Sequence, residues 1–248
     1  MREAINQLID AALNNASDAT GRNLMRGFQG IHRAGKLLFR RNDADQRLER
    51  NNARCSDSAN VPDVQTIMTR GFMHGQRLSP QNHLEIGETG TGGANGCGPI
   101  AVYNAIYQLN GQRNAPNPAE IIYALERDGA FNLGGLAGTN PEAMVTYLRE
   151  IGRKAEISYL PSNLDASISA AGVTILLYSG GGAYIHYVMV RYVAGGNAAG
   201  TQRGESQFLI YNRGSNDQNH VATSSVDQWA ATGLNGTPYR PLALITVA

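Results

Sequence analysis

The sequence predicts an α+β fold in which helices come first and an antiparallel sheet follows. Two observations lead to this prediction. Helix start and stop signals recur between residues 97 and 152, and short runs rich in Val, Ile and Tyr, bounded by glycine or polar turns, fill much of 155–248. Helices followed by a run of strands are typical of α+β domains.

Three helices are expected in the first of these stretches. The apolar run CGPIAVYNAIYQL at 97–109 forms one of them. The other two share an asparagine N-cap, a proline at the first helical position and a glycine stop. These signals are Asn117, Pro118 and Gly129 in one helix, and Asn140, Pro141 and Gly152 in the other.

Five strands are expected after residue 154. Each is a short run in which β-branched and aromatic residues are frequent, which favours strands over helices. The runs are 155–160, 173–179, 183–194, 206–213 and 241–248, and the stretch SSVDQWAATG at 224–233 places one more short helix among them.

Residues 1–88 differ from the rest of the chain in their sequence pattern and are predicted to form a helical N-terminal extension or subdomain. A catalytic domain at 89–248 is predicted to follow it. The beginning has apolar residues at helical spacing: Ile5, Leu8, Ile9, Ala12 and Leu13. The charged run 40–60 is expected to be a solvated helix end followed by an exposed loop. A second helix, docked on the core, is expected in 61–78, where Val64, Ile67, Met68 and Phe72 are spaced helically.

Three uses remain open for this extension. A permanently packed subdomain is favoured, because amphipathic segments need a surface on which to bury their apolar faces. An inhibitory pro-segment that lies over the active-site cleft is the runner-up, and a partner-binding module is the third.

The composition excludes several classes of protein. The 248 residues are 42% hydrophobic and 17% charged with a net charge of +1, which argues against nucleic acid or an anionic membrane as a partner. Two cysteines cannot form a disulfide framework, and no zinc-ligand spacing is present, so no metal is expected. No segment resembles a signal peptide or a membrane span, so we expect a cytoplasmic protein, or one exported without a cleavable Sec signal. The oligomeric state is left open.

Cys97 is the candidate nucleophile. It precedes the apolar helix and lies between Gly96 and Gly98, which leave space for a substrate carbonyl. Backbone N–H groups at a helix N-terminus lower the pKa of a thiol, so we expect Cys97 to ionise below the usual value. The alternative is a small hydrophobic residue that fills the core. The second cysteine, Cys55, lies in the charged run and is interpreted as incidental.

His186 and Asn212 are the candidate base and orienting group. His186 lies in the strand AYIHYVMVRYV, where alternation places it on one face with Tyr184, Val188 and Val190. Asn212 ends the next strand, from which an amide can orient an imidazole. Read singly, the first would be a core histidine and the second a strand-terminating residue. His220 is a reserve base.

Residues from about 95 to 248 resemble papain-like cysteine peptidases, especially the branch that includes bacterial bacteriocin-processing (double-glycine) peptidases. The resemblance rests on GCGPIAVYNAI, YIHYVMV and FLIYNRGS, in the order Cys, His, Asn. It implies a papain-like fold, a thiolate–imidazolium pair of Cys97 and His186, an acyl-enzyme thioester and a peptide or protein substrate. It implies no metal and no organic cofactor.

One feature departs from that family. Its members usually carry a glutamine about six residues before the cysteine as an oxyanion-hole donor, and here Thr91 occupies that position. Asn95 is the nearest amide and is predicted to act with the backbone N–H of Cys97. Loss of one such donor typically costs a factor of about a hundred to a thousand in rate.

Three functions therefore stand as hypotheses. The first is a thiol hydrolase that cleaves a peptide or related amide bond with Cys97, His186 and Asn212. The second uses the same residues for deamidation or acyl transfer, as in effectors or toxins. The third is a catalytically inactive binding scaffold.

Overall fold

A computed structural model describes residues 18–37, 39–56, 71–77, 81–131, 138–180, 185–195, 207–214, 219–234 and 236–248. It confirms the α+β class: within these ranges eight α-helices accompany a six-stranded antiparallel sheet. The finer, papain-like assignment stays a prediction.

All five predicted strands lie in this sheet. Its order is β3-β8-β4-β5-β6-β7, so the last strand of the chain is inserted between two earlier ones, and every neighbouring pair is antiparallel. The strands are β3 (Ala155–Tyr159), β4 (Val173–Ser179), β5 (Ile185–Val193), β6 (Gln207–Tyr211), β7 (Val221–Thr223) and β8 (Arg240–Val247).

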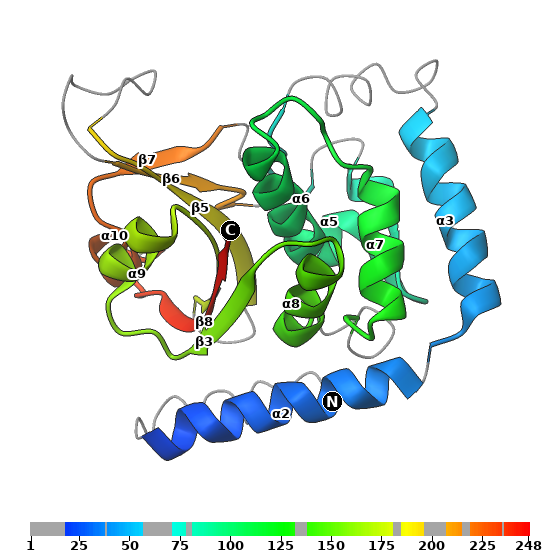
Figure 1. Ribbon diagram of the computed structural model, residues 1–248, viewed down its shortest axis with the longest axis horizontal. Helices are drawn as coiled ribbons and strands as arrows, with labels where there is room; N and C mark the ends of the chain where they lie inside the picture. Colours follow the sequence, from blue (N-terminus) through cyan, green and yellow to red (C-terminus); the bar gives the residue numbers. More distant parts are fainter. Residues whose placement is uncertain are drawn as a thin grey trace.

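Helices cover both faces of the sheet (Figure 1). One face carries α6 (Cys97–Leu109), α7 (Pro118–Arg127) and α8 (Pro141–Glu150), and the other carries α9 (Leu164–Ala171) and α10 (Val226–Thr232). Side chains of β5 alternate between two cores. Tyr187 and Met189 belong to the α6 side, whereas Val188 and Val190 belong to the α9–α10 side.

The predicted helix signals are confirmed at α7 and α8. The side chain of Asn117 accepts a hydrogen bond from Ala119 N at 3.0 Å, and that of Asn140 accepts one from Glu142 N at 2.9 Å. The chain leaves both helices through glycines at positive φ, 69° at 129 and 81° at 152, a conformation that favours glycine.

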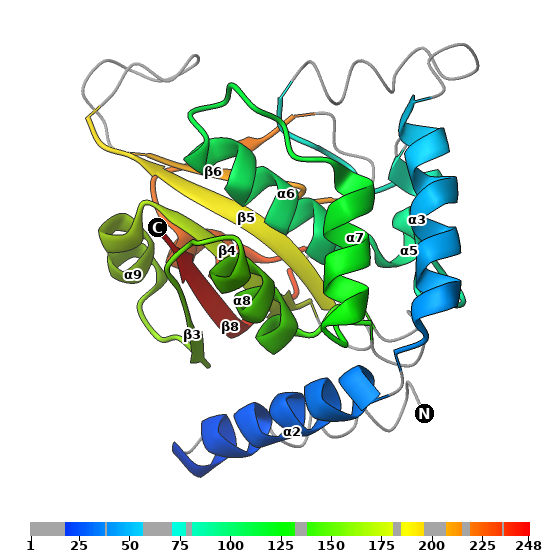
Figure 2. The same cartoon turned by 45° about the vertical axis from the view of Figure 1, so that its right-hand side comes forward.

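The described part of the charged run 40–60, which ends at residue 56, is a docked helix and not the predicted solvated helix end and exposed loop. Residues Arg41–Ser56 form a helix, α3, that packs along α7 (Figure 2). Its inner face buries Ala44, Arg47 and Asn51. The prediction was wrong because α3 docks through polar groups: Arg47 pairs with Glu126, and the Asn51 amide hydrogen-bonds the backbone of residue 85 in both directions.

The capping asparagines also hold the N-terminal helices. Asn117 donates from Nδ2 to Asn52 Oδ1 on α3 at 2.8 Å. Asn140 donates from Nδ2 to the backbone carbonyl of Phe28 at 2.9 Å, in α2 (Asp18–Leu37). Each cap therefore binds its own helix with the oxygen and a distant segment with the nitrogen.

The remainder of the extension contributes to the main core. Residues 1–17 and 57–70, which include the predicted helical positions Ile5–Leu13 and Val64–Met68, lie outside the described residues. Phe72 is not helical: it lies in a non-helical segment at 71–77, whose Met73 enters the core that Leu84 and Ile86 also join. The boundary at residue 88 therefore stays a prediction, although residues on both sides of it share one core.

The glycine-rich approach to α6 is a compact set of short elements. It contains η1 (Gln81–His83), β1 (Glu85–Ile86), β2 (Gly90–Thr91) and α5 (Gly92–Asn95), with β1 and β2 paired antiparallel. Among the described helices, none is both long and apolar enough to cross a membrane.

The buried ion pair predicts how strongly α3 is attached. Arg47→Ala leaves Glu126 charged in a site where both side chains are almost 90% buried, so we expect the free energy of unfolding to fall by about 3–5 kcal/mol. The control, Arg41→Ala, breaks an exposed pair with Asp45 and should cost less than about 1 kcal/mol. Urea denaturation measures both, and equal small losses would contradict the buried attachment.

Candidate active site around Cys97

Cys97 is the first residue of α6, and its sulfur lies against strand β5. Only 7% of the residue is exposed. The backbone N–H groups of Tyr187, Gly98 and Cys97 itself are directed at the thiol. The sulfur is thus placed at the N-terminus of a 13-residue helix and beside the residue that follows His186.

The predicted low pKa of Cys97 is wrong for this conformation. Burial raises the pKa of the thiol and outweighs the three backbone N–H groups, which lower it. The free energy lost when a thiolate is removed from water is larger than the stabilisation that the partial charges of these N–H groups provide. In this state Cys97 is a neutral thiol near pH 7.

The two glycines that flank Cys97 serve close packing and not substrate access. A Cβ at residue 98 would overlap the Thr139 side chain, including Oγ1, and a Cβ at residue 96 would overlap the backbone carbonyl of Gly92. Thr139 is buried, and its Oγ1 has no hydrogen-bond partner among the described residues. Its backbone carbonyl accepts a hydrogen bond from the Tyr187 hydroxyl at 2.9 Å.

His186 lies close to Asn212 but on the other face of the sheet from Cys97. Its Nε2 is 2.5 Å from the backbone oxygen of Asn212. Its ring packs edge-on against Tyr178, the cross-strand neighbour, whose side chain belongs to the α9–α10 core. The backbone of β5 therefore separates the imidazole from the thiol, and the structure brings together His186 and Asn212 but not the full triad.

Asn212 follows β6 and turns the chain with φ of 60°, a left-handed conformation that asparagine tolerates better than most residues. It is fully buried, and its side-chain amide has no hydrogen-bond partner in the described part of the chain. The prediction gave the orienting role to this amide. In the structure the backbone carbonyl holds the imidazole, and the amide is left unpaired.

Gln76 is an amide near α6 that the sequence analysis missed. Its Nε2 donates to the carbonyl of Gly93 at 3.1 Å, one helical turn before Cys97, while its buried Oε1 is unpaired within the described residues. It lies 21 residues before Cys97, so no spacing rule pointed to it. The predicted donor, Asn95, ends α5 and is half-buried, and Thr91 is exposed in β2.

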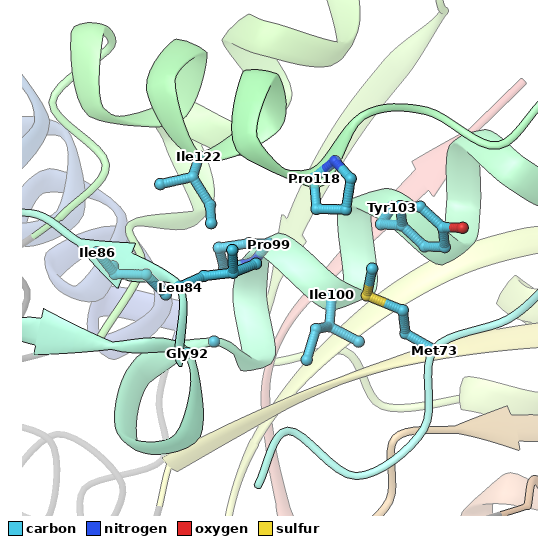
Figure 3. A pocket seen from close by; sticks show the side chains of 10 residues that line it. Met73, Leu84, Ile86, Gly92, Pro99, Ile100, Tyr103, Pro118 and Ile122 are labelled. Atoms are coloured by element: carbon cyan, nitrogen blue, oxygen red, sulfur yellow. The ribbon is translucent and has the colours of Figure 1, made fainter. Parts of the chain in front are cut away.

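A small apolar cavity lies beside this turn (Figure 3). Pro99 and Ile100 of α6 form one wall, and Met73, Leu84 and Ile122 contribute to the others. Its volume is about 10 Å³, about enough for one water molecule. In this conformation it is too small for a substrate side chain.

His220 and Cys55 are the remaining candidates. The ring of His220 packs against Tyr211 at 5.3 Å, and burial together with Arg191 lowers its pKa. Cys55 is half-buried in α3, where burial raises its pKa. Across the described ranges, no three His, Cys, Asp or Glu residues are grouped so that they could hold a metal ion.

No protein-family model matches this chain, and no curated protein matches it either.

Proposed function

We propose that the protein is a papain-like thiol hydrolase that cleaves a peptide or related amide bond. The observation that carries this proposal is the meeting of two elements. The N-terminus of α6 presents the Cys97 sulfur to the β5 backbone directly beside His186, and Asn212 holds the imidazole of His186. The proposed nucleophile, base and orienting residue thus belong to α6, to β5 and to the residue that follows β6.

The proposed reaction proceeds through a thioester. His186 takes the proton of the Cys97 thiol, and the thiolate attacks the carbonyl carbon to form a C–S bond. The resulting oxyanion accepts hydrogen bonds from the Cys97 N–H and from the Gln76 amide. The C–N bond breaks as His186 returns the proton to the leaving amine, and water, deprotonated by His186, then hydrolyses the thioester.

In this proposal the structure is the closed form of the enzyme. The thiol must become exposed, and the His186 ring must move to the α6 side of the sheet. His186 lies in a part of β5 whose described pairing is with β4 alone, since pairing with β6 begins at Met189. A strand end with one neighbour can rearrange at lower cost than one held on both sides.

A non-catalytic scaffold is the second candidate. The buried Cys97 thiol, with its raised pKa, is the observation that favours it, because a structural cysteine has these properties. Deamidation and acyl transfer are outcomes of the same thioester chemistry, which differ in the leaving group or in the acceptor.

Incubation with a peptide library derived from denatured proteins tests the proposal, with Cys97→Ala as the control. Mass spectrometry distinguishes new peptide termini, glutamine converted into glutamate, and joined peptides. New termini that require Cys97 support hydrolysis. The second and third products replace it with deamidation or transfer, and the absence of all three supports the scaffold.

Reactivity of the two cysteines gives a prediction. A peptidyl vinyl sulfone, which mimics an amide substrate, should label Cys97 much faster than Cys55, because binding opens the closed site and His186 can then activate the Cys97 thiol. His186→Ala should slow this labelling severalfold, and Cys55→Ser should leave it unchanged. Peptide mapping measures the rates. Equal labelling of both cysteines that does not depend on His186 would refute the catalytic role.

Substitution of Gln76 gives a second prediction. If its amide stabilises the oxyanion, Gln76→Glu should lower kcat by about a hundredfold to a thousandfold with little change in KM, because glutamate keeps the size but loses the donor. Gln112→Glu, at a surface turn, is the matched control. A loss confined to KM, or no loss, would remove Gln76 from the reaction.

A further inference from the structure

Helix α2 is docked on the body of the protein by few contacts (Figure 1). The Phe28 ring stacks on Tyr159 of β3 with centroids 5.9 Å apart, and residues 35 and 129, both glycines, bring the two backbones into contact. Four apolar side chains of α2 are partly buried, and one of them, Phe28, packs against the main core; the four are Leu24, Met25, Phe28 and Ile31. Each of these side chains is more than half buried, so apolar burial contributes to the docking, and a charge placed in this interface would weaken it.

A continuous set of contacts leads from α2 to the candidate nucleophile. The Phe28 carbonyl accepts the Asn140 amide at 2.9 Å. The preceding residue, Thr139, packs directly on Gly98, next to Cys97, and its carbonyl binds the Tyr187 hydroxyl. Thr139, which contacts both neighbours of the thiol, Gly98 and Tyr187, is therefore linked to α2 through Asn140.

His32 is the titratable group at this interface. Its imidazole hydrogen-bonds the backbone of Asp128, while Nε2 is buried and has no hydrogen-bond partner in the described chain. The charges that face it are Lys36 of α2, Asp128 at the end of α7 and Glu142 of α8, and Glu142 also accepts the Tyr159 hydroxyl. Burial lowers the pKa of His32, Lys36 lowers it further, and the two carboxylates only partly oppose them.

We propose that α2 is a pH-sensitive latch on the Cys97 site, docked while His32 is neutral and released when His32 gains a proton. The release of α2 follows from the contacts at its interface, and only its effect on Cys97 rests on the proposed function. Protonation creates a cation whose Nε2–H is buried without an acceptor, which disfavours the docked state. Release removes the acceptor of the Asn140 amide and so loosens the link that holds the Thr139 segment against Gly98.

The direction of the pH dependence follows from the lowered pKa. In the released helix His32 has its ordinary pKa of about 6.5, and in the docked helix a lower one. The released state therefore binds more protons between these two values. His32 supports docking fully above about pH 6.5, and this support is lost as the pH falls through that window.

Hydrogen exchange of the full chain tests the latch. Protection of α2 is measured at about pH 7.5 and about pH 5.5 after correction for intrinsic exchange, with α3 as an internal reference. We expect α2 to lose protection severalfold at the lower pH, while α3 keeps its own. His32→Gln, which keeps a donor for Asp128 but does not titrate, should remove the difference.

A matched pair of cap variants tests the link to α2. Asn140→Asp keeps the N-cap oxygen but loses the donor to Phe28, so α2 should lose protection at both pH values. Asn117→Asp makes the same change at the N-cap of α7, where the amide of Asn117 binds α3. It should leave the protection of α2 unchanged.

The labelling rate of Cys97 tests the consequence at the site. At about pH 5.5, where α2 is released in the wild type and stays docked in His32→Gln, the wild type should react faster with the vinyl sulfone than His32→Gln. Protection of α2 that is the same at both pH values, or that falls equally in His32→Gln, would overturn the latch. If hydrogen exchange of α2 depends on pH as expected but Cys97 does not react with the vinyl sulfone, the latch is supported and the proposed function is refuted.

Discussion

The first turn of α6 packs so tightly that residues 96 and 98 have no room for side chains. Gly98 lies on Thr139, Gly96 lies on the carbonyl of Gly92, and the sulfur between them lies on the backbone of β5. This packing brings a helix N-terminus, a strand and a capping segment to one place. It also explains why the thiol is buried: the approach that directs three N–H groups at the sulfur removes it from water.

Attachment of the N-terminal helices depends on polar groups more than on apolar area. The two cap asparagines use one amide each to begin a helix and to hold a segment more than 60 residues away. The buried pair of Arg47 and Glu126 then fastens α3 along α7. Paired charges of this kind confer specificity of docking, and each partner is costly to remove alone. The N-terminal helices are thus packed on the body of the protein, α3 along α7 and α2 against α8 and β3.

Much of the fold could be predicted from the sequence because its signals are local. Proline after an asparagine cap marked α7 and α8, and runs of β-branched residues marked the strands. The alternation that groups His186 with Val188 was also predicted, but the sequence does not say which face meets α6. That depends on long-range packing, which places Tyr187 and not His186 beside the thiol.

The misinterpreted parts share a physical cause. Helix α3 has a strongly polar composition, so its burial follows from specific ion pairs that hydrophobic patterns do not record. Gln76 reaches the turn before Cys97 from a distant segment, so spacing from the cysteine could not identify it. The raised pKa of Cys97 reflects desolvation, which depends on how the whole site closes.

In the proposed mechanism, a closed thiol site opens into a working triad. A crystal structure with a peptidyl aldehyde, which bonds reversibly to an active thiol, tests it most directly. We expect a covalent bond to Cys97, the His186 ring on the α6 side within hydrogen-bond reach of the sulfur, and the Gln76 amide facing the hemithioacetal oxygen. An adduct with His186 still packed on Tyr178, or the absence of any adduct at saturating aldehyde, would contradict it.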